Sequence, residues 1–220
     1  MESSYLDSIF SSFNHALERE GAPLPSVSII AEEDNDPYRI LTATIISLRT
    51  KDKVTLSSSR ALFERAKCFE ELANLSVEEI EDAIKPAGFY KRKSEELKRI
   101  ARIVLDEYDG KLPNDLDKLM ALPGVGIKTA SLVLNLSFNS AAICVDCHVH
   151  QVVNRLGWVS TKTPEETEKE LRKILPERFW IPLNEMLVRY GQYICLPISP
   201  YCSKCPLDGE CKKAGVVKSR

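Results

Sequence analysis

The stretch that decides the fold is Leu122-Pro123-Gly124-Val125-Gly126-Ile127-Lys128-Thr129-Ala130. Apolar residues at helical spacing precede it, and a longer apolar run follows from Ala130 onward. Pro123 and the two glycines interrupt this pattern, because neither residue type favours a helix interior. The sequence therefore predicts a helix, a tight turn and a second helix.

The composition of this turn suits an anion. Glycine adopts positive φ at little cost and allows close approach of another group. Amides at a helix start lie at the positive end of the helix dipole. Lys128 is expected in the first turn of the second helix, where the same field, together with burial, would favour a neutral and nucleophilic amine. The alternative from the turn alone is a solvated surface lysine.

Length and charge leave the partner open. The chain has 220 residues, enough for one large or two small domains, and a formal net charge of −2. An acidic run at 32–36 contrasts with basic runs at 91–102 and 212–220. Each run is more typical of a solvated face than of a binding surface, but nucleic-acid binding needs only one basic face. With no apolar stretch long enough for a bilayer, we expect a soluble cytoplasmic protein without a membrane partner.

The apolar periodicity predicts a mostly α-helical protein with about ten helices. The run 40–48 is apolar nearly all round, which favours a buried helix after Pro37, although its β-branched residues leave a strand as the alternative. The segment from Pro23 to the acidic run is expected to be a loop. The other predicted helices are 4–19, 52–66, 77–85, 91–108, 115–121, 126–137, 146–156, 163–174 and 178–193.

The C-terminal cysteines are the strongest chemical signal. Cys195, Cys202, Cys205 and Cys211 fall in a Pro-containing loop too short to build a core. An intracellular chain does not rely on disulfides, so the four thiolates indicate zinc or an iron–sulfur cluster. A single Cys-x-x-Cys unit favours [4Fe–4S], because structural zinc sites commonly pair two such units. The remaining cysteines, Cys68, Cys144 and Cys147, are expected to be buried packing residues.

Asp146 lies between the turn and the cysteines, where a helix N-cap belongs, and capping is its simplest role. His148 and His150 are two residues apart and cannot share a helix face, which argues against a paired metal site.

Three motifs together resemble the endonuclease III family, the iron–sulfur branch of the helix-hairpin-helix DNA glycosylases. They are Leu-Pro-Gly-Val-Gly-x-Lys-Thr-Ala, Val-Asp-x-His with its aspartate eighteen residues after the lysine, and Cys-x6-Cys-x2-Cys-x5-Cys. The resemblance covers nearly the whole chain. It implies an all-α protein whose two helical domains flank a DNA cleft. Residues 30–140 would form a six-helix barrel with the helix-hairpin-helix, and residues 1–29 with 141–220 a helical domain carrying a [4Fe–4S] cluster on the four cysteines.

The resemblance also implies the chemistry. Lys128 would attack C1′ of a damaged nucleotide, expel an oxidised pyrimidine, and form a Schiff base that permits β-elimination at an abasic site. Asp146 would stabilise the oxocarbenium-like charge or deprotonate the lysine. The expected partner is double-stranded DNA containing damaged bases or abasic sites, bound by a monomer.

Further residues match the family's DNA-binding positions. Gly124, Val125 and Gly126 would bind a phosphate through backbone amides, and the target base would flip out of the duplex. Phe89 would intercalate, with a core aromatic as an equally weighted alternative, and Lys91 follows it in the basic run. Arg49 stands where the bacterial pattern often has a glutamine that fills the gap left by the flipped base. Asp52 is expected to cap the next helix.

The basic groups are expected to converge on one face, with the acidic run and the Glu165–Glu170 helix away from DNA. This face would include the hairpin amides, Lys128, Arg49, the 91–102 run and the cysteine-loop lysines Lys204, Lys212 and Lys213. Two alternatives differ in class. A mismatch glycosylase of the same fold would usually carry serine or tyrosine in place of Lys128. A non-catalytic DNA-binding or redox module would use only the hairpin and the cluster, and the joint presence of Lys128 and Asp146 argues against it.

Overall fold

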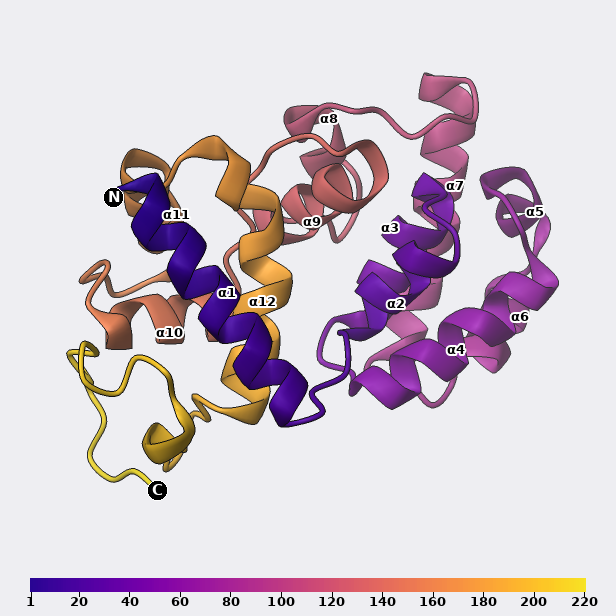
Figure 1. Ribbon diagram of the computed structural model, residues 1–220. Helices are drawn as coiled ribbons and strands as arrows, with labels where there is room; N and C mark the ends of the chain where they lie inside the picture. Colours follow the sequence, from indigo (N-terminus) through magenta and orange to yellow (C-terminus); the bar gives the residue numbers. More distant parts are fainter. The chain divides into compact units, whose positions relative to one another are not determined.

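The computed structural model describes residues 1–220, and all of its regular elements are helices (Figure 1). It contains twelve α-helices, two 3-10 helices and no strand, which confirms the predicted all-α fold class. None of its helices has the length and apolar character needed to cross a membrane.

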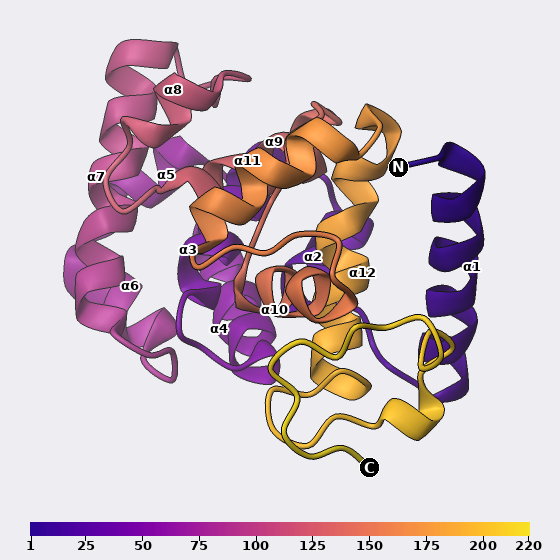
Figure 2. The same ribbon diagram turned by 90° about the vertical axis from the view of Figure 1, so that its left-hand side faces the viewer.

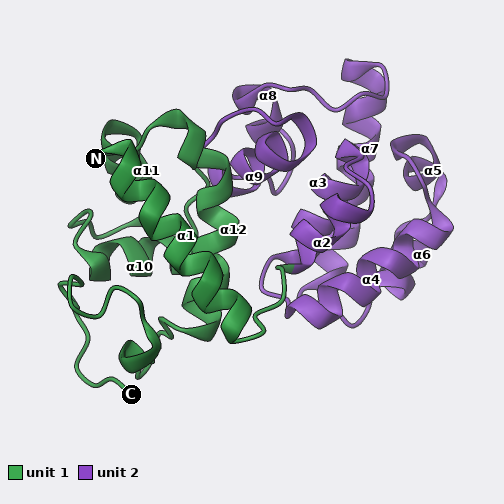
Figure 3. Cartoon of the chain, in the orientation of Figure 1, with its two compact units in different colours: residues 1–25, 143–220 green, residues 26–142 purple.

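The chain divides into two compact units (Figure 3). Unit 1 comprises residues 1–25 and 143–220, and unit 2 comprises residues 26–142. The family resemblance predicts boundaries at 29/30 and 140/141. The first observed boundary falls earlier because a helix beginning at Ser26 packs against the helices of unit 2.

Unit 2 is the helical body that carries the Gly-rich turn. Its helices are α2 (Ser26–Glu33), α3 (Pro37–Ser47), α4 (Asp52–Arg65), α5 (Phe69–Asn74), α6 (Val77–Ile84), α7 (Tyr90–Tyr108), α8 (Leu116–Met120) and α9 (Ile127–Phe138).

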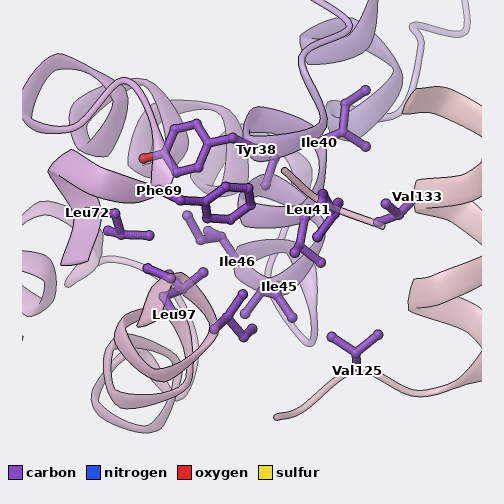
Figure 4. Packing of buried hydrophobic residues seen from close by; sticks show 14 of the residues in the cluster. Tyr38, Ile40, Leu41, Ile45, Ile46, Phe69, Leu72, Leu97, Val125 and Val133 are labelled. Atoms are coloured by element: carbon purple, nitrogen blue, oxygen red, sulfur yellow. The ribbon is translucent and has the colours of Figure 1, made fainter. Parts of the chain in front are cut away.

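Helix α3 is the centre of unit 2, because α2, α4, α7 and α9 all pack against it. Its side chains from Ile40 to Ile46 are buried on every face, and Figure 4 shows several of them converging with residues from other helices. At one end Tyr38 meets the edge of the Phe69 ring, 5.0 Å between centroids, and donates a hydrogen bond to the carbonyl oxygen of Ala66 at 2.8 Å. A helix buried all round needs no polar face, which explains its sequence.

The strand alternative for 40–48 is wrong, and the reason lies at the start of α3. Asp36 accepts hydrogen bonds from the amides of Tyr38 (2.7 Å) and Arg39 (3.4 Å), and Pro37 occupies the first helical position. These are local N-terminal signals, and together with burial they outweigh the β-branched residues.

Helix α2 lies in a segment that was expected to be a loop. Its first residue, Ser26, donates from its amide to Oδ1 of Asp52 at 3.0 Å and from its hydroxyl to the same oxygen. Asp52 thus accepts hydrogen bonds at the start of α2. The N-cap of its own helix, α4, is Lys51, whose side chain makes no capping hydrogen bond. The expectation that Asp52 caps the next helix is therefore wrong, because its carboxylate is used by a remote amide.

Unit 1 is a second helical body with its own core. Its elements are α1 (Ser3–Arg19), α10 (Cys147–Leu156), α11 (Pro164–Ile174), η1 (Glu177–Phe179), α12 (Trp180–Tyr193) and η2 (Cys202–Lys204). Helix α12 packs against both α1 and α10, and the Phe13 and Tyr190 rings lie 4.1 Å apart within this core. Both tryptophans, Trp158 and Trp180, pack against the same core.

The last part of unit 1, from Cys195 onward, is nearly all irregular and is drawn in yellow beside α10 and α12 in Figure 2. Its backbone returns on itself through hydrogen bonds from the Tyr201 amide to the Ile194 carbonyl (2.9 Å) and from the Arg220 amide to the Pro200 carbonyl (2.8 Å). Side chains of regular helices supply further donors, from Arg155 of α10 to the Leu196 carbonyl (2.7 Å) and from Arg19 of α1 to the Lys204 carbonyl (2.9 Å).

Candidate functional site

The Gly-rich turn connects α8 to α9, as predicted. Asp115 caps α8 by accepting from the Lys118 amide at 2.9 Å, and the buried Leu122 and Val125 anchor the turn in the core of unit 2. Gly124 has φ +74°, and a Cβ added there would lie 2.7 Å from a carboxylate oxygen of Glu96. Position 124 therefore needs glycine both for its backbone angle and for the space beside Glu96.

The amides of the turn are not equivalent. The Val125 amide donates to the carbonyl oxygen of Leu122 at 3.2 Å, so it is already used within the turn. Gly124 and Gly126 are exposed, and their amides donate to no backbone acceptor of the turn. Those two amides are consequently the better placed of the three for an external anion.

Helix α9 begins directly after its N-cap residue, Gly126, and Lys128 is its second residue. Its side chain is exposed, so the expected burial is wrong. It lines a cavity of about 510 Å³ in unit 2 together with Gly124, Arg49 and Phe89. The cavity thus brings together four of the residues singled out from the sequence, whereas Lys91, Val125 and Gly126 do not line it.

Five further residues line this cavity: Ser47, Leu48, Arg92, Lys93 and Glu96. Of these, Arg92 and Lys93 were predicted only as members of the basic run, and the other three were not predicted. Glu96 is buried and accepts a hydrogen bond from Arg92 Nε at 2.8 Å. Lys93 is only 4% exposed, although the sequence analysis treated it as part of a basic surface run. The burial of Lys93 could have been predicted from its spacing, because Leu97 and Ile100, four and seven residues later, share one helix face with it and are buried.

Arg49 and Phe89 both line this cavity and lie next to each other. The guanidinium carbon of Arg49 is 5.5 Å from the centroid of the Phe89 ring, which is cation–π distance. Phe89 is 62% exposed, so the core alternative for it is wrong. Both residues have left-handed backbone conformations, with φ of +52° and +57°. A non-glycine residue in this region costs about 1–3 kcal/mol, and such strain clusters at binding sites.

Asp146 belongs to unit 1, where it caps α10. Its Oδ1 accepts from the amides of His148 and Val149, both at 2.9 Å, and the residue is 8% exposed. The capping role is thus present, and it fixes the orientation of the carboxylate. His148 instead packs closely against α12, where a Cβ on Gly191 would lie 2.6 Å from its Nδ1. His150 contacts the Thr167 hydroxyl at 2.6 Å.

The four C-terminal cysteines line a single cavity in unit 1, which is otherwise walled mainly by apolar side chains of α10, α12 and the segment itself. No group of three or more His, Cys, Asp or Glu side chains in the chain is arranged so that it could hold a metal ion as it stands. The sulfurs thus share a cavity without forming a mononuclear site.

Hydrogen-bond donors point at three of these sulfurs. Tyr190 donates its hydroxyl to Cys205 Sγ (3.0 Å), Arg155 Nη1 donates to Cys195 Sγ (3.4 Å), and the Lys213 amide donates to Cys211 Sγ (3.3 Å). Burial raises the pKa of the Cys195 and Cys205 thiols, and burial likewise raises the pKa of Tyr190. Donors aimed at sulfur suit thiolates, and buried thiolates need a positive partner such as a metal cluster. The residue set therefore fits an iron–sulfur group.

Two of the three other cysteines are not buried, contrary to the prediction. Cys144 is buried, as predicted, but Cys68 and Cys147 are exposed. Cys68 precedes α5, a short helix that the sequence analysis missed, and Cys147 opens α10. Exposed positions at helix starts carry little apolar contact, so packing does not explain these two residues.

The basic residues proposed for a DNA face separate into two groups. Several are committed to protein acceptors: Lys93 and Lys98 donate to backbone carbonyls, Lys204 pairs with Glu20, and Lys213 pairs with Asp208. Lys91 is exposed, and so is Lys212. Inclusion of Lys93 in the predicted basic face is therefore wrong, because its ammonium points into the protein.

Comparison with known proteins places the chain in a family. Residues 42–177 match the model of the HhH-GPD superfamily base excision DNA repair proteins. Endonuclease III of Thermotoga maritima is 45% identical over 180 residues, covering 82% of this chain and 84% of that protein. The chloroplastic endonuclease III homolog 1 of Arabidopsis thaliana is 41% identical over 80% of this chain, which spans about half (49%) of that longer relative.

Solved structures of DNA repair proteins also match the chain. A trapped endonuclease III–DNA covalent intermediate matches with a TM-score of 0.77 and 34% identity, covering 81% of this chain and 84% of that chain. A thermostable thymine-DNA glycosylase matches with a TM-score of 0.82 and 26% identity, covering 94% of this chain and 95% of that chain.

Proposed function

Because the chain belongs to the HhH-GPD superfamily of base excision DNA repair proteins, and within it to the endonuclease III family, we propose that it is a DNA glycosylase with abasic-site lyase activity. Its substrate is double-stranded DNA that contains oxidised pyrimidines or abasic sites. One observation carries the proposal. Lys128 follows the Gly-rich turn and lines the unit 2 cavity, in a chain 34% identical to an endonuclease that has been trapped covalently on DNA.

In the proposed reaction the neutral amine of Lys128 attacks C1′ of the damaged nucleotide. The bond from C1′ to the base breaks, and the base leaves with the electron pair and a proton. Opening of the sugar ring gives an iminium between Nζ and C1′. Loss of a proton from C2′ then expels the 3′ phosphate, which is the β-elimination step. Hydrolysis of the iminium returns the lysine.

Asp146 assists this reaction. Its carboxylate stabilises positive charge that develops on the sugar, or takes the proton that Lys128 must lose before attack. The hydrogen bonds from the two backbone amides at the start of α10 hold this carboxylate in one orientation, which supports a role that requires positioning. We further propose that units 1 and 2 are the two domains that flank the DNA.

The exposed elements around the cavity support DNA binding. The Gly124 and Gly126 amides bind a backbone phosphate, with Val125 contributing its buried side chain as the anchor of the turn. Phe89 enters the base stack, and Arg49 occupies the space that the flipped base leaves. Lys91 and Lys212 are exposed and contact phosphates.

We also infer that Cys195, Cys202, Cys205 and Cys211 hold one [4Fe–4S] cluster. The shared apolar cavity and the donors aimed at sulfur support this inference. Such a cluster would be held by the four thiolates, would offset part of their charge, and would cross-link the irregular C-terminal segment. Arg155 and Tyr190 then act as the hydrogen-bond donors that fix two of its ligands.

Borohydride trapping on abasic-site DNA tests the proposed function, because only a Schiff-base enzyme becomes covalently attached. The parental protein should cross-link, and Lys128→Gln should not cross-link while it still binds the DNA. Lys118→Gln is the matched control, since Lys118 is an exposed lysine of α8 on the other side of the turn. Cross-linking of Lys128→Gln at the parental rate would refute the assignment.

A thymine mismatch glycosylase is the second candidate, favoured by the longer and closer structural match to the thymine-DNA glycosylase. Duplexes that carry either an oxidised pyrimidine or a G·T mismatch separate the two. Removal of thymine without strand cleavage would support the second candidate, whereas removal of the oxidised base with cleavage supports the first.

A further inference from the structure

Lys93 is a buried cation in the wall of the unit 2 cavity that the reaction proposed above does not use. It lies on α7, and burial of an ammonium is costly unless its donors are satisfied. All three are used: Nζ donates to the carbonyl oxygens of Ile46 and Leu48, both at 2.7 Å, and to the hydroxyl of Thr50 at 2.9 Å.

These acceptors surround Arg49. Ile46 belongs to the last turn of α3 and Leu48 is its C-cap, so their carbonyls are among those that a helix end leaves without partners. An ammonium at a helix C-terminus also has the favourable sign for the dipole. Lys93 therefore caps α3 from another helix and fixes the backbone on both sides of Arg49.

The same ammonium reaches the Phe89 loop through Thr50. The hydroxyl of Thr50 accepts from Lys93 and also from the amide of Gly88 at 3.1 Å. The two loops touch at this point, because a Cβ on Gly88 would lie 2.7 Å from the carbonyl oxygen of Arg49. The chain of contacts thus runs from Lys93 to Thr50, to Gly88 and to Phe89.

Arg49 and Phe89 both need such support. Each has a left-handed backbone, and such strain persists only where surrounding contacts over-determine it. Their side chains are exposed and have little packing against the core. The fixed backbone therefore holds the Arg49 guanidinium over the Phe89 ring.

From these contacts we propose that Lys93 is a positioning residue, whose ammonium locks the Arg49 loop and the Phe89 loop into one rigid element that enters the DNA. The proposal rests on the proposed function for its consequence in DNA, while the lock itself is a property of the free protein. Lys93 touches no reacting atom.

Lys93→Met tests the proposal, because methionine retains an apolar stem and removes all three donors. Val104→Ala is the control for general destabilisation, since Val104 is a fully buried residue of the same helix that is remote in sequence from the loop contacts. Hydrogen exchange on the free proteins gives the first readout. Lys93→Met should lose protection selectively in residues 46–50 and 87–90, and Val104→Ala should not.

Single-turnover kinetics give the second readout. Lys93→Met should excise a paired lesion about 10-fold to 100-fold more slowly than the parental protein, with a smaller loss in cleavage at an abasic site, where no damaged base must be extruded. Lys93→Arg, which keeps the charge and donors, should recover part of the excision rate.

The outcomes separate the two proposals. Parental exchange rates in both loops of Lys93→Met would overturn the lock, whatever the kinetics. Selective loop exchange in Lys93→Met, together with failure of the parental protein in borohydride trapping, would leave the lock standing and refute the proposed function. Selective loop exchange with equal losses on both DNA substrates would overturn the role of the lock in base extrusion.

Discussion

In each unit, one cation from a neighbouring helix holds a segment of irregular backbone. In unit 2, Lys93 of α7 binds the turn after α3. In unit 1, Arg155 of α10, 8% exposed, donates to the carbonyl oxygens of Cys195 (3.3 Å), Leu196 (2.7 Å) and Pro197 (2.8 Å) at the start of the cysteine segment.

The two cations differ in chemistry. Lys93 is a compact charge whose protonation can change, whereas an arginine stays charged at any ordinary pH. Arg155 also donates to the sulfur of Cys195, whereas Lys93 donates to oxygen atoms only. The contacts of Lys93 can therefore change with pH, and those of Arg155 cannot.

The largest expected effect comes from removing the cation of unit 1. Arg155→Met removes the donor to the carbonyl oxygens of Leu196 and Pro197 and to the sulfur of Cys195, while the Cys195 carbonyl keeps its hydrogen bond from Gln151. An unsatisfied buried acceptor costs about 1–3 kcal/mol. We expect a loss of about 3 kcal/mol or more in the free energy of unfolding, together with reduced iron per chain. Calorimetry and elemental analysis measure these two quantities.

Arg60→Met is the control for that experiment, because Arg60 is an exposed arginine of α4 that pairs with the exposed Glu33. An exposed pair contributes about 1 kcal/mol or less. Equal losses for the two arginine variants would contradict the special role of Arg155, and full iron content in Arg155→Met would show that the cluster segment does not depend on it.

A smaller effect is expected where the two loops of unit 2 meet. Gly88→Ala places a methyl group against the Arg49 carbonyl, and forced packing of this kind costs about 1–3 kcal/mol. Gly209→Ala in the cysteine segment is the counterpart, with open space around its Cβ and an expected change within about 0.5 kcal/mol. Urea denaturation of both variants measures the difference in the free energy of unfolding. Equal stability would mean that the Gly88 and Arg49 loops are not tightly packed against each other.

A pH dependence should distinguish the two cations, because Lys93 can lose its proton and Arg155 cannot. Burial lowers the pKa of Lys93 from 10.5 to about 8, and the charge of Glu96 partly offsets this. The unfolded chain therefore binds more protons than the folded one between about pH 8 and pH 10.5. The contribution of Lys93 to the free energy of unfolding should rise with pH across that window. The charged groups that line the same cavity are Arg49, Arg92, Glu96 and Lys128.

Deprotonation removes one of the three donors of Lys93, so the loops should loosen while the protein becomes more stable. Urea denaturation from pH 7 to pH 10, with Lys93→Met as the reference, isolates the contribution of this residue from those of other titrating groups. A constant stability difference between the two proteins over this range would contradict the lowered pKa.

Local signals made much of the fold predictable. The Asp36-Pro37 start of α3, Asp146 at α10 and Thr163 at α11 are N-caps that the sequence displays directly, with side-chain bonds to nearby amides. Helix α2 was missed because its capping carboxylate, Asp52, comes from twenty-six residues away. A tertiary cap leaves no pattern in the segment that it stabilises.

The candidate site was predictable to the extent that motifs carry it. Lys128 and Gly124 follow from the hairpin, and they do line one cavity. The left-handed backbones of Arg49 and Phe89 and the inward direction of Lys93 did not follow, because they depend on contacts between α3, α7 and two loops. Composition marked Lys93 as part of a basic run, whereas its helical spacing places it on the buried face.

The placement of both tryptophans in unit 1 has a practical consequence. Trp180 donates from Nε1 to the Leu175 carbonyl at 3.0 Å, and Trp158 packs on the same core, while unit 2 contains no indole at all. Intrinsic tryptophan emission therefore reports the melting of unit 1 alone, and far-ultraviolet circular dichroism reports both helical bodies. Superimposed transitions from the two signals would mean that the units unfold together, and a gap between them would give each unit its own midpoint without any label or truncation.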